Sequence, residues 1–367
     1  MKKKILFLTI LLCIFVTGCF GGDKNDIVKK VEKKYSNLKS YKLTGDLQIV
    51  NNDDVYNYDV KVIYQKKDKF NVSLVNKANN HEQIILKNDD GVYVLTPSLN
   101  KSFKFQSDWP YNNSQTYLIS SIINDILDDD DRSLVEDENY YLITTDVNYP
   151  NNRKLVKQVV KFDKDYNLKE VKVVDENDIE QMKMTFTTIE INQKVDSSTF
   201  DLDAIMGTNN NETPTPSPTP TPSPTPTPSQ TPSPSPSANT TCTSGECQST
   251  TETGVLEDTI YPLYIPTGTK LASEEKVKKS DGERIIMTFE GEKPFLLVEE
   301  TASIEQEFSI IPTYGEPYLL IDTVGALTDS SITWNSNGID YYIVSDVMSQ
   351  DELVDIARSI NVVPNAK

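Results

Sequence analysis

Residues 213–237 form a low-complexity segment that divides this chain into two parts. The segment contains 11 of the 20 prolines in the sequence, separated almost entirely by threonine and serine. Such a composition favours extended polyproline II structure and offers no apolar side chains for a core. At about 3.1 Å per residue, its length reaches roughly 75 Å. We therefore expect two folded domains, residues 23–205 and 254–367, joined by a proline-rich linker over 206–253.

The N-terminus has the features of a bacterial secretion signal. Lys2, Lys3 and Lys4 precede the apolar run 5–16, which is too short for a membrane-spanning helix of about 20 residues. The run leads to Val-Thr-Gly-Cys at 16–19, which resembles the bacterial lipobox, where the cysteine thiol receives a diacylglycerol. Residues 1–18 are thus expected to be a signal peptide, and residues 19–22 a lipidated N-terminus with the lipid on Cys19. Two acyl chains give stable anchoring, so we expect the protein on the extracytoplasmic face of the cell membrane.

Composition excludes several classes of function. The formal net charge of −19 argues against nucleic-acid binding, which needs clustered Lys and Arg. One histidine and four scattered cysteines leave no inventory for a His/Cys metal site or a Ser-His-Asp triad. Asp128 to Asp131 lack the alternating ligands, glycine and final glutamate of an EF-hand calcium loop, which favours a solvated acidic loop. We expect no enzyme activity, no cofactor and no metal.

Residues 23–205 show a helix followed by many strands. Ile27, Val31, Tyr35 and Leu38 form one apolar stripe of a surface helix. Alternating apolar residues then predict about ten antiparallel strands, and residues 115–127 have helical periodicity. The strands are expected near 41–49, 56–64, 70–74, 82–87, 91–95, 101–106, 139–147, 155–163, 168–175 and 180–191. The pattern predicts a strongly curved antiparallel sheet crossed by helices.

Residues 254–367 predict a smaller α+β domain. This part contains 20 acidic and 8 basic residues, a net charge of −12. Strands are expected near 284–290, 295–301 and 318–324, and a hairpin joins 331–334 to 339–345 through Asn337-Gly338. Ser349 and Glu352 have the spacing of a capping box that starts a helix. The last helix and the hairpin are similar to a family of uncharacterised extracytoplasmic domains.

The stretch GVYVLTPSLNKSFKFQSDWPYNNSQTYL at 91–118, with the opening helix and the closing DSSTF at 196–200, resembles a known family. It is similar to sporulation- and germination-associated lipoproteins of spore-forming Gram-positive bacteria. These belong to the superfamily of the outer-membrane lipoprotein carrier (LolA-like) and the sigma-factor regulator RseB. The resemblance implies a mainly β fold, a half-open antiparallel β-barrel with a helical lid over an apolar cavity that holds acyl chains or senses mislocalised lipoprotein.

Seven apolar residues are the candidates for that cavity: Phe70, Val72, Tyr93, Phe103, Phe105, Trp109 and Tyr117. An apolar strand face has the same pattern whether it lines a cavity or fills a core, so both alternatives remain. Their role in a cavity is shape-based binding of acyl chains or an apolar peptide face.

Cys242 and Cys247 flank a short loop, and outside the cytoplasm we expect a disulfide between them, with free thiols as the alternative. The function we expect is binding of a lipid, lipoprotein or envelope protein partner in sporulation, germination or envelope regulation. The alternatives are a protein-interaction scaffold with no cavity ligand and an RseB-like regulator of a transmembrane anti-sigma factor.

Overall fold

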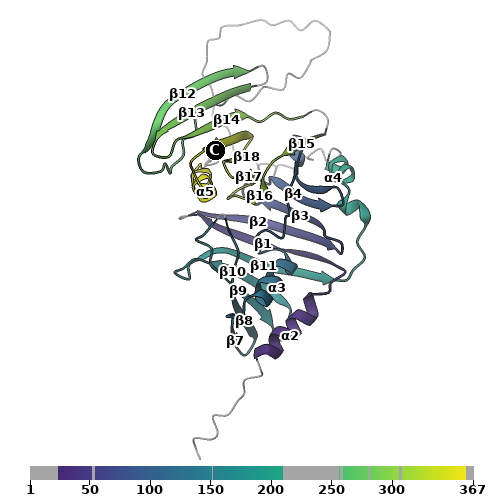
Figure 1. The fold of residues 1–367 in the computed structure, drawn as a ribbon. Helices are drawn as coiled ribbons and strands as arrows, with labels where there is room; N and C mark the ends of the chain where they lie inside the picture. The colour runs from purple at the N-terminus through teal and green to yellow at the C-terminus, as the bar shows by residue number, and fades with distance from the viewer. Residues whose placement is uncertain are drawn as a thin grey trace, which may run out of the picture.

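The computed structural model describes residues 24–51, 54–150, 152–209, 256, 259–279, 282–305 and 308–360. Two β-sheets make up most of this part of the chain, and a few helices pack on them (Figure 1). We call residues 24–209 the N-terminal half and residues 256–360 the C-terminal half. Cys19, the linker segment 213–237, Cys242 and Cys247 lie outside the described residues.

The first sheet has 12 strands in the order β15-β6-β5-β4-β3-β2-β1-β11-β10-β9-β8-β7, so it is open at β15 and β7. Its neighbours are antiparallel except β15, which pairs in parallel with β6. The strands are β1 (Ser40–Asn51), β2 (Asp54–Gln65), β3 (Lys69–Asn76), β4 (Glu82–Asn88), β5 (Gly91–Thr96), β6 (Lys101–Phe105), β7 (Ser133–Glu136), β8 (Tyr140–Asp146), β9 (Lys157–Asp163), β10 (Leu168–Val174), β11 (Glu180–Ile191) and β15 (Ser309–Thr313).

Alternation of apolar and polar residues gives this sheet two different faces. One face packs on α2 (Lys24–Tyr35) and α3 (Ile119–Asp128), and Val31 and Ile122 from these helices belong to the main core. On the other face, a smaller cluster includes Leu86 of β4 and Phe200, which is the last residue of the 3-10 helix η3 (Ser197–Phe200). The adjoining α4 (Leu202–Asn209) adds Met206 to this cluster.

A bulge in β11, opposite the middle of β1, adds to the curvature of the first sheet. The pairing of β1 with β11 shifts register between Thr44 and Gly45. A Cβ atom on Gly45 would lie 2.3 Å from the carbonyl oxygen of Thr185, so this approach of two strands requires glycine.

The second sheet has seven antiparallel strands in the order β12-β13-β14-β19-β18-β17-β16, with one helix against it. The elements are β12 (Thr269–Lys279), β13 (Gly282–Gly291), β14 (Phe295–Thr301), β16 (Glu316–Leu319), β17 (Val324–Leu327), β18 (Ser331–Ser336), β19 (Ile339–Val344) and α5 (Gln350–Arg358). Ser349 and Glu352 form the expected capping box at the start of α5. The turn between β18 and β19 has positive φ at Asn337 and Gly338, as Asn-Gly predicts.

The fold class predicted from the sequence is confirmed, with corrections to single elements. The helix expected over 115–127 begins at Ile119, because Leu118 has extended backbone geometry. The strand expected near 318–324 is two strands, β16 and β17, joined by a turn in which Leu320 N donates to Thr323 O. The sequence patterns missed β7, β12, β15 and α4.

Candidate binding site

A cavity of about 290 Å³ lies between the two halves of the molecule. One wall comes from β5, β6 and β15 of the first sheet, and the other from β14 and β17 to β19 of the second sheet. Its walls are mostly apolar, and the apolar residues that line it are Val94, Phe103, Phe105, Val298, Ile311, Val324, Ala326, Trp334, Tyr341 and Tyr342. The cavity is near the lower limit of about 300 Å³ for ligand pockets, which suits a narrow apolar chain.

Three polar side chains in this cavity have unused hydrogen-bonding capacity. Lys101 is only 5% exposed, and its Nζ lies 3.6 Å from Asp340 Oδ2, beyond hydrogen-bond length. The Thr96 hydroxyl and the Tyr341 hydroxyl are buried and find no hydrogen-bond partner within the described residues. Buried polar groups without partners are uncommon, and each calls for a partner such as water or a ligand.

Side-chain hydrogen bonds fix one wall of the cavity to the other. The Gln83 Oε1 atom on β4 accepts hydrogen bonds from Val324 N at 2.5 Å and Thr323 Oγ1 at 3.0 Å. Its Nε2 donates to Val324 O at 3.4 Å, so one amide pairs with both backbone groups of Val324. Tyr58 Oη also donates to Ile321 O at 2.5 Å. These buried contacts join β2 and β4 to the segment that leads into β17.

The strand β15 closes the cavity at the edge of the first sheet. Five residues of β15 pair in parallel with β6, and Ile311 lies opposite Phe103. The approach to β15 is held by three further bonds, from Asn100 Nδ2 to Glu305 O, from Glu305 N to Leu99 O and from Ser309 N to Asn100 O. The C-terminal half therefore supplies a strand to the N-terminal sheet.

The structure separates the seven predicted cavity residues into three groups. Phe103 and Phe105 line the cavity between the halves. Tyr93 lies in the smaller cluster on the other face of the sheet. The remaining four are buried in the main core among other side chains: Phe70, Val72, Trp109 and Tyr117. Phe70 and Trp109 pack edge to face, with ring centroids 5.7 Å apart. A ligand role for the seven residues stays a prediction.

Sequence patterns gave no signal for most of the cavity. Trp334 and Tyr341 stack at 4.9 Å and belong to the core of the second sheet, so their alternation predicts a strand and nothing more. Gln83 and Lys101 are isolated polar residues in predicted strands. A polar residue at a core-facing position of a strand is the one signal that marks them.

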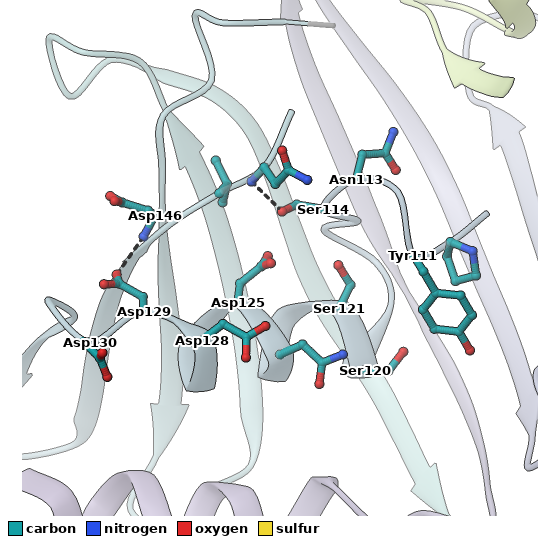
Figure 2. Close-up of a pocket in the computed structure, with 14 residues that line it drawn as sticks. Tyr111, Asn113, Ser114, Ser120, Ser121, Asp125, Asp128, Asp129, Asp130 and Asp146 are labelled. Carbon is teal, nitrogen blue, oxygen red and sulfur yellow. Dashed lines mark hydrogen bonds between the residues drawn. The ribbon is translucent and has the colours of Figure 1, made fainter. Parts of the chain in front are cut away.

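A second hollow, of about 490 Å³, is lined by acidic and hydroxyl side chains beside α3 (Figure 2). Asp125, Asp128, Asp129, Asp130 and Asp146 contribute carboxylates. Within the described ranges, no group of three or more His, Cys, Asp or Glu side chains is arranged to hold a metal ion. The hollow is an acidic surface depression, and the solvated loop at Asp128 to Asp131 stays a prediction.

Two carboxylates in this hollow differ in their ionisation. Burial raises the pKa of Asp125 to about 7, although Ser114 and Gln158 donate hydrogen bonds to it. For Asp129, burial opposes ionisation, but hydrogen bonds from Asp146 N and Thr145 Oγ1 outweigh it and lower the pKa. The hollow thus holds a carboxyl on α3 that ionises near neutral pH, beside the Asp129 carboxylate that hydrogen bonds keep ionised.

Glu299 is a buried carboxyl in the second sheet. Its residue is 0% exposed, and both carboxylate oxygens accept a hydrogen bond from Ile260 N at 3.2 Å. Burial raises its pKa to about 7. The contact attaches the segment before β12 to β14.

Asp125 should make stability depend on pH. Its folded-state pKa lies above the usual 3.8, so ionisation opposes folding. Below about pH 4 the carboxyl is protonated in both the folded and the unfolded state, so it does not change the free energy of unfolding. As the pH rises from 4 toward 7 it ionises more readily in the unfolded state, and stability is lost. We expect Asp125→Asn to flatten this part of the profile and to gain up to about 2 kcal/mol at pH 8, after allowance for partial exposure. Urea unfolding at several pH values measures this.

Asp130→Asn is the matched control, because Asp130 is an exposed carboxylate in the same hollow. The pH profile of this variant should follow that of the unmodified chain. An Asp125→Asn profile that keeps the original slope between pH 4 and 7 would contradict the assignment. Glu299 also has a raised pKa, but it is present in both variants, so its effect on the pH dependence of stability cancels when the two profiles are compared.

The described residues thus define a class of protein, a two-sheet β protein with an apolar cavity between its halves. They contain no helix that is long and apolar enough to cross a membrane. A family model described as "Sporulation protein YdcC-like" matches residues 1–200. The sporulation protein YdcC of Bacillus subtilis is 34% identical over 361 residues, covering 98% of this chain and 97% of the relative. The chain belongs to the sporulation protein YdcC-like family.

Comparison with solved structures gave matches of low identity and low TM-score. One is the Pseudomonas aeruginosa MucA/MucB complex, with 10% identity and a TM-score of 0.30, covering 91% of this chain and 98% of the matched one. Another is the Clostridioides difficile CwlD amidase in complex with the GerS lipoprotein, with 16% identity and a TM-score of 0.29. This match covers 47% of this chain and 98% of the matched chain. A LolA superfamily protein from Nitrosomonas europaea has 11% identity and a TM-score of 0.29. This match covers 50% of this chain and 99% of the matched chain.

Proposed function

We propose that this sporulation-family chain is a lipid-anchored, extracytoplasmic binding protein without catalytic activity, which holds an acyl chain of a lipid or lipoprotein in the cavity between its halves. The observation that supports this most directly is the 290 Å³ cavity with apolar walls and the unpartnered Thr96 hydroxyl. The lipobox at 16–19 supports the anchor at Cys19 and the location on the membrane. The residue inventory supports the absence of catalysis.

The geometry of the cavity favours a ligand with an apolar body and one polar end. Phe103, Phe105 and Trp334 provide flat apolar surfaces for a chain. Lys101 and Thr96 provide a cation and a hydroxyl in the same cavity, which suit a carboxylate, phosphate or ester oxygen. A fully apolar ligand would leave the Thr96 hydroxyl without a hydrogen-bond partner, at a cost in affinity.

The experiment is native mass spectrometry of the whole chain, extracted gently from membranes of its host, with Ile311→Trp as the test variant. Ile311 lines the cavity and is partly exposed, so an indole there fills the cavity with little strain on the core. We expect a stoichiometric added mass in the lipid range on the unmodified chain. The occupied fraction should fall at least about tenfold in Ile311→Trp, because a filled cavity excludes the acyl chain.

Ile310→Trp is the matched control. Ile310 is the neighbouring residue of the same strand, is 48% exposed and does not line the cavity. It should keep the added mass. A folded chain that is empty in every preparation, or a ligand that both variants retain equally, would contradict the proposal and favour a protein partner.

A further inference from the structure

The surface around α2 is basic, although the chain as a whole is acidic. Six exposed lysines lie on α2, on the link from α2 to β1 and on the turn between β2 and β3: Lys29, Lys30, Lys33, Lys39, Lys66 and Lys67. The turn lies beside the link, because Lys66 N donates to Lys39 O at 2.8 Å. We call these six residues the basic end.

Local charge at the basic end has the opposite sign to the rest of the molecule. Segments 24–42 and 65–69 contain ten lysines and three carboxylates, a net of +7, whereas the whole chain has a formal net charge of −19. The three carboxylates are Asp26, Glu32 and Asp68, and all are exposed.

Most lysines of the basic end are available to a partner. Lys30 lies over the Tyr166 ring and carries a raised pKa through its contact with that hydroxyl. The other five, Lys29, Lys33, Lys39, Lys66 and Lys67, form no ion pair with any residue that the structure describes. By contrast, the nearby Lys34 and Lys69 are engaged, with Asn167 and Asp89. These five cations without an ion pair therefore lie on three neighbouring segments of the chain.

The basic end also lies close to the proposed anchor along the chain. Lys24 follows Cys19 by five residues, which span at most about 18 Å when fully extended. In Figure 1, α2 lies at the far end of the first sheet from the second sheet. The described C-terminal half, which belongs to the part 254–367 whose net charge is −12, is thus on the other side of the molecule.

We propose that the basic end is a docking surface for the anionic phospholipid headgroups of the membrane in which the chain is anchored. The inference rests on the proposed lipid anchor at Cys19, which brings α2 within reach of the leaflet. Each lysine near an anionic surface adds roughly a fivefold preference for binding. The same surface potential repels the acidic C-terminal half, so the two charges together orient the molecule with α2 toward the bilayer.

The test uses the whole chain from residue 19 with Cys19→Ser, so that vesicle binding does not depend on acyl chains. Cosedimentation with phosphatidylglycerol–phosphatidylcholine vesicles at low salt should show binding, and pure phosphatidylcholine vesicles should not. Replacing Lys29, Lys33, Lys66 and Lys67 together with glutamine should weaken binding at least about tenfold. Raising the salt concentration should have a similar effect, because exposed charges are screened over about 8 Å at physiological ionic strength.

The control variant replaces Lys157, Lys270, Lys276 and Lys278, which are exposed lysines elsewhere in the chain, with glutamine. This variant changes the net charge by the same amount as the basic-end variant, and it should bind the anionic vesicles as well as the Cys19→Ser chain does. No binding to anionic vesicles, equal binding to neutral vesicles, or equal losses in both lysine variants would overturn the inference. The anchor is tested separately by the membrane fraction of the unmodified chain in its host, which Cys19→Ser should lose.

Discussion

Replacing Trp109 with alanine should lower the free energy of unfolding by about 3–5 kcal/mol. Trp109 is 1% exposed and is among the largest fully buried side chains in the described part of the molecule. It packs edge to face on Phe70, and its carbonyl accepts a hydrogen bond from Lys87 Nζ at 2.7 Å. Removal of the indole leaves a void that neighbouring strands cannot fill. Urea unfolding followed by circular dichroism measures the change without using tryptophan fluorescence.

Tyr314→Ala is the control, since Tyr314 is a large aromatic residue that is 77% exposed. Its effect should stay within about 0.5 kcal/mol. The comparison also separates the two alternatives for the predicted cavity residues. A residue that fills a core costs stability when it is truncated, whereas a residue that lines an open cavity costs far less. A loss below 1 kcal/mol in Trp109→Ala would therefore favour an internal cavity at this position.

Local sequence patterns predicted those elements whose signals are complete within a few residues. The capping box at Ser349 to Glu352 specifies the start of α5 through hydrogen bonds within one helical turn. Asn337-Gly338 specifies the turn of the last hairpin through backbone geometry that these residues tolerate. Strands with one covered face, such as β3, alternate between buried and partly exposed residues along their whole length. In each case the physical cause and the sequence signal lie in the same segment.

The missed elements have no such local cause. The strand β12 is exposed along nearly its whole length and pairs with β13 along one edge, so its sequence TKLASEEKVKK has no apolar alternation. The strand β15 is held by backbone pairing with β6, about 200 positions earlier in the chain. The cavity combines walls from the same distant segments. A single sequence indicates which faces are apolar, but not which of two apolar faces will meet.

Gln83 is the residue whose loss should most affect how the two halves are held together. Its amide makes three buried hydrogen bonds across the boundary, two with the backbone of Val324 and one with Thr323 Oγ1. Gln83→Leu keeps most of the side-chain volume but leaves the Val324 N–H and C=O without partners. Each buried group left unpaired costs about 1–3 kcal/mol, so we expect a total loss of about 2–5 kcal/mol. Amide hydrogen exchange at Val324 should then accelerate by more than about tenfold.

Gln48→Leu is the matched control for this prediction. Gln48 is a partly exposed glutamine of the same sheet, and its Nε2 donates one hydrogen bond to Asn57 Oδ1 within the N-terminal half. Exchange at Val324 should be unchanged in this variant. If Gln83→Leu loosens the boundary as expected, it should also lower ligand occupancy, because the cavity needs both walls in place. Unchanged exchange at Val324 in Gln83→Leu would mean that the other contacts across the boundary, such as those of Tyr58 with Ile321 and of Asn112 with Glu316, are enough to hold the halves together.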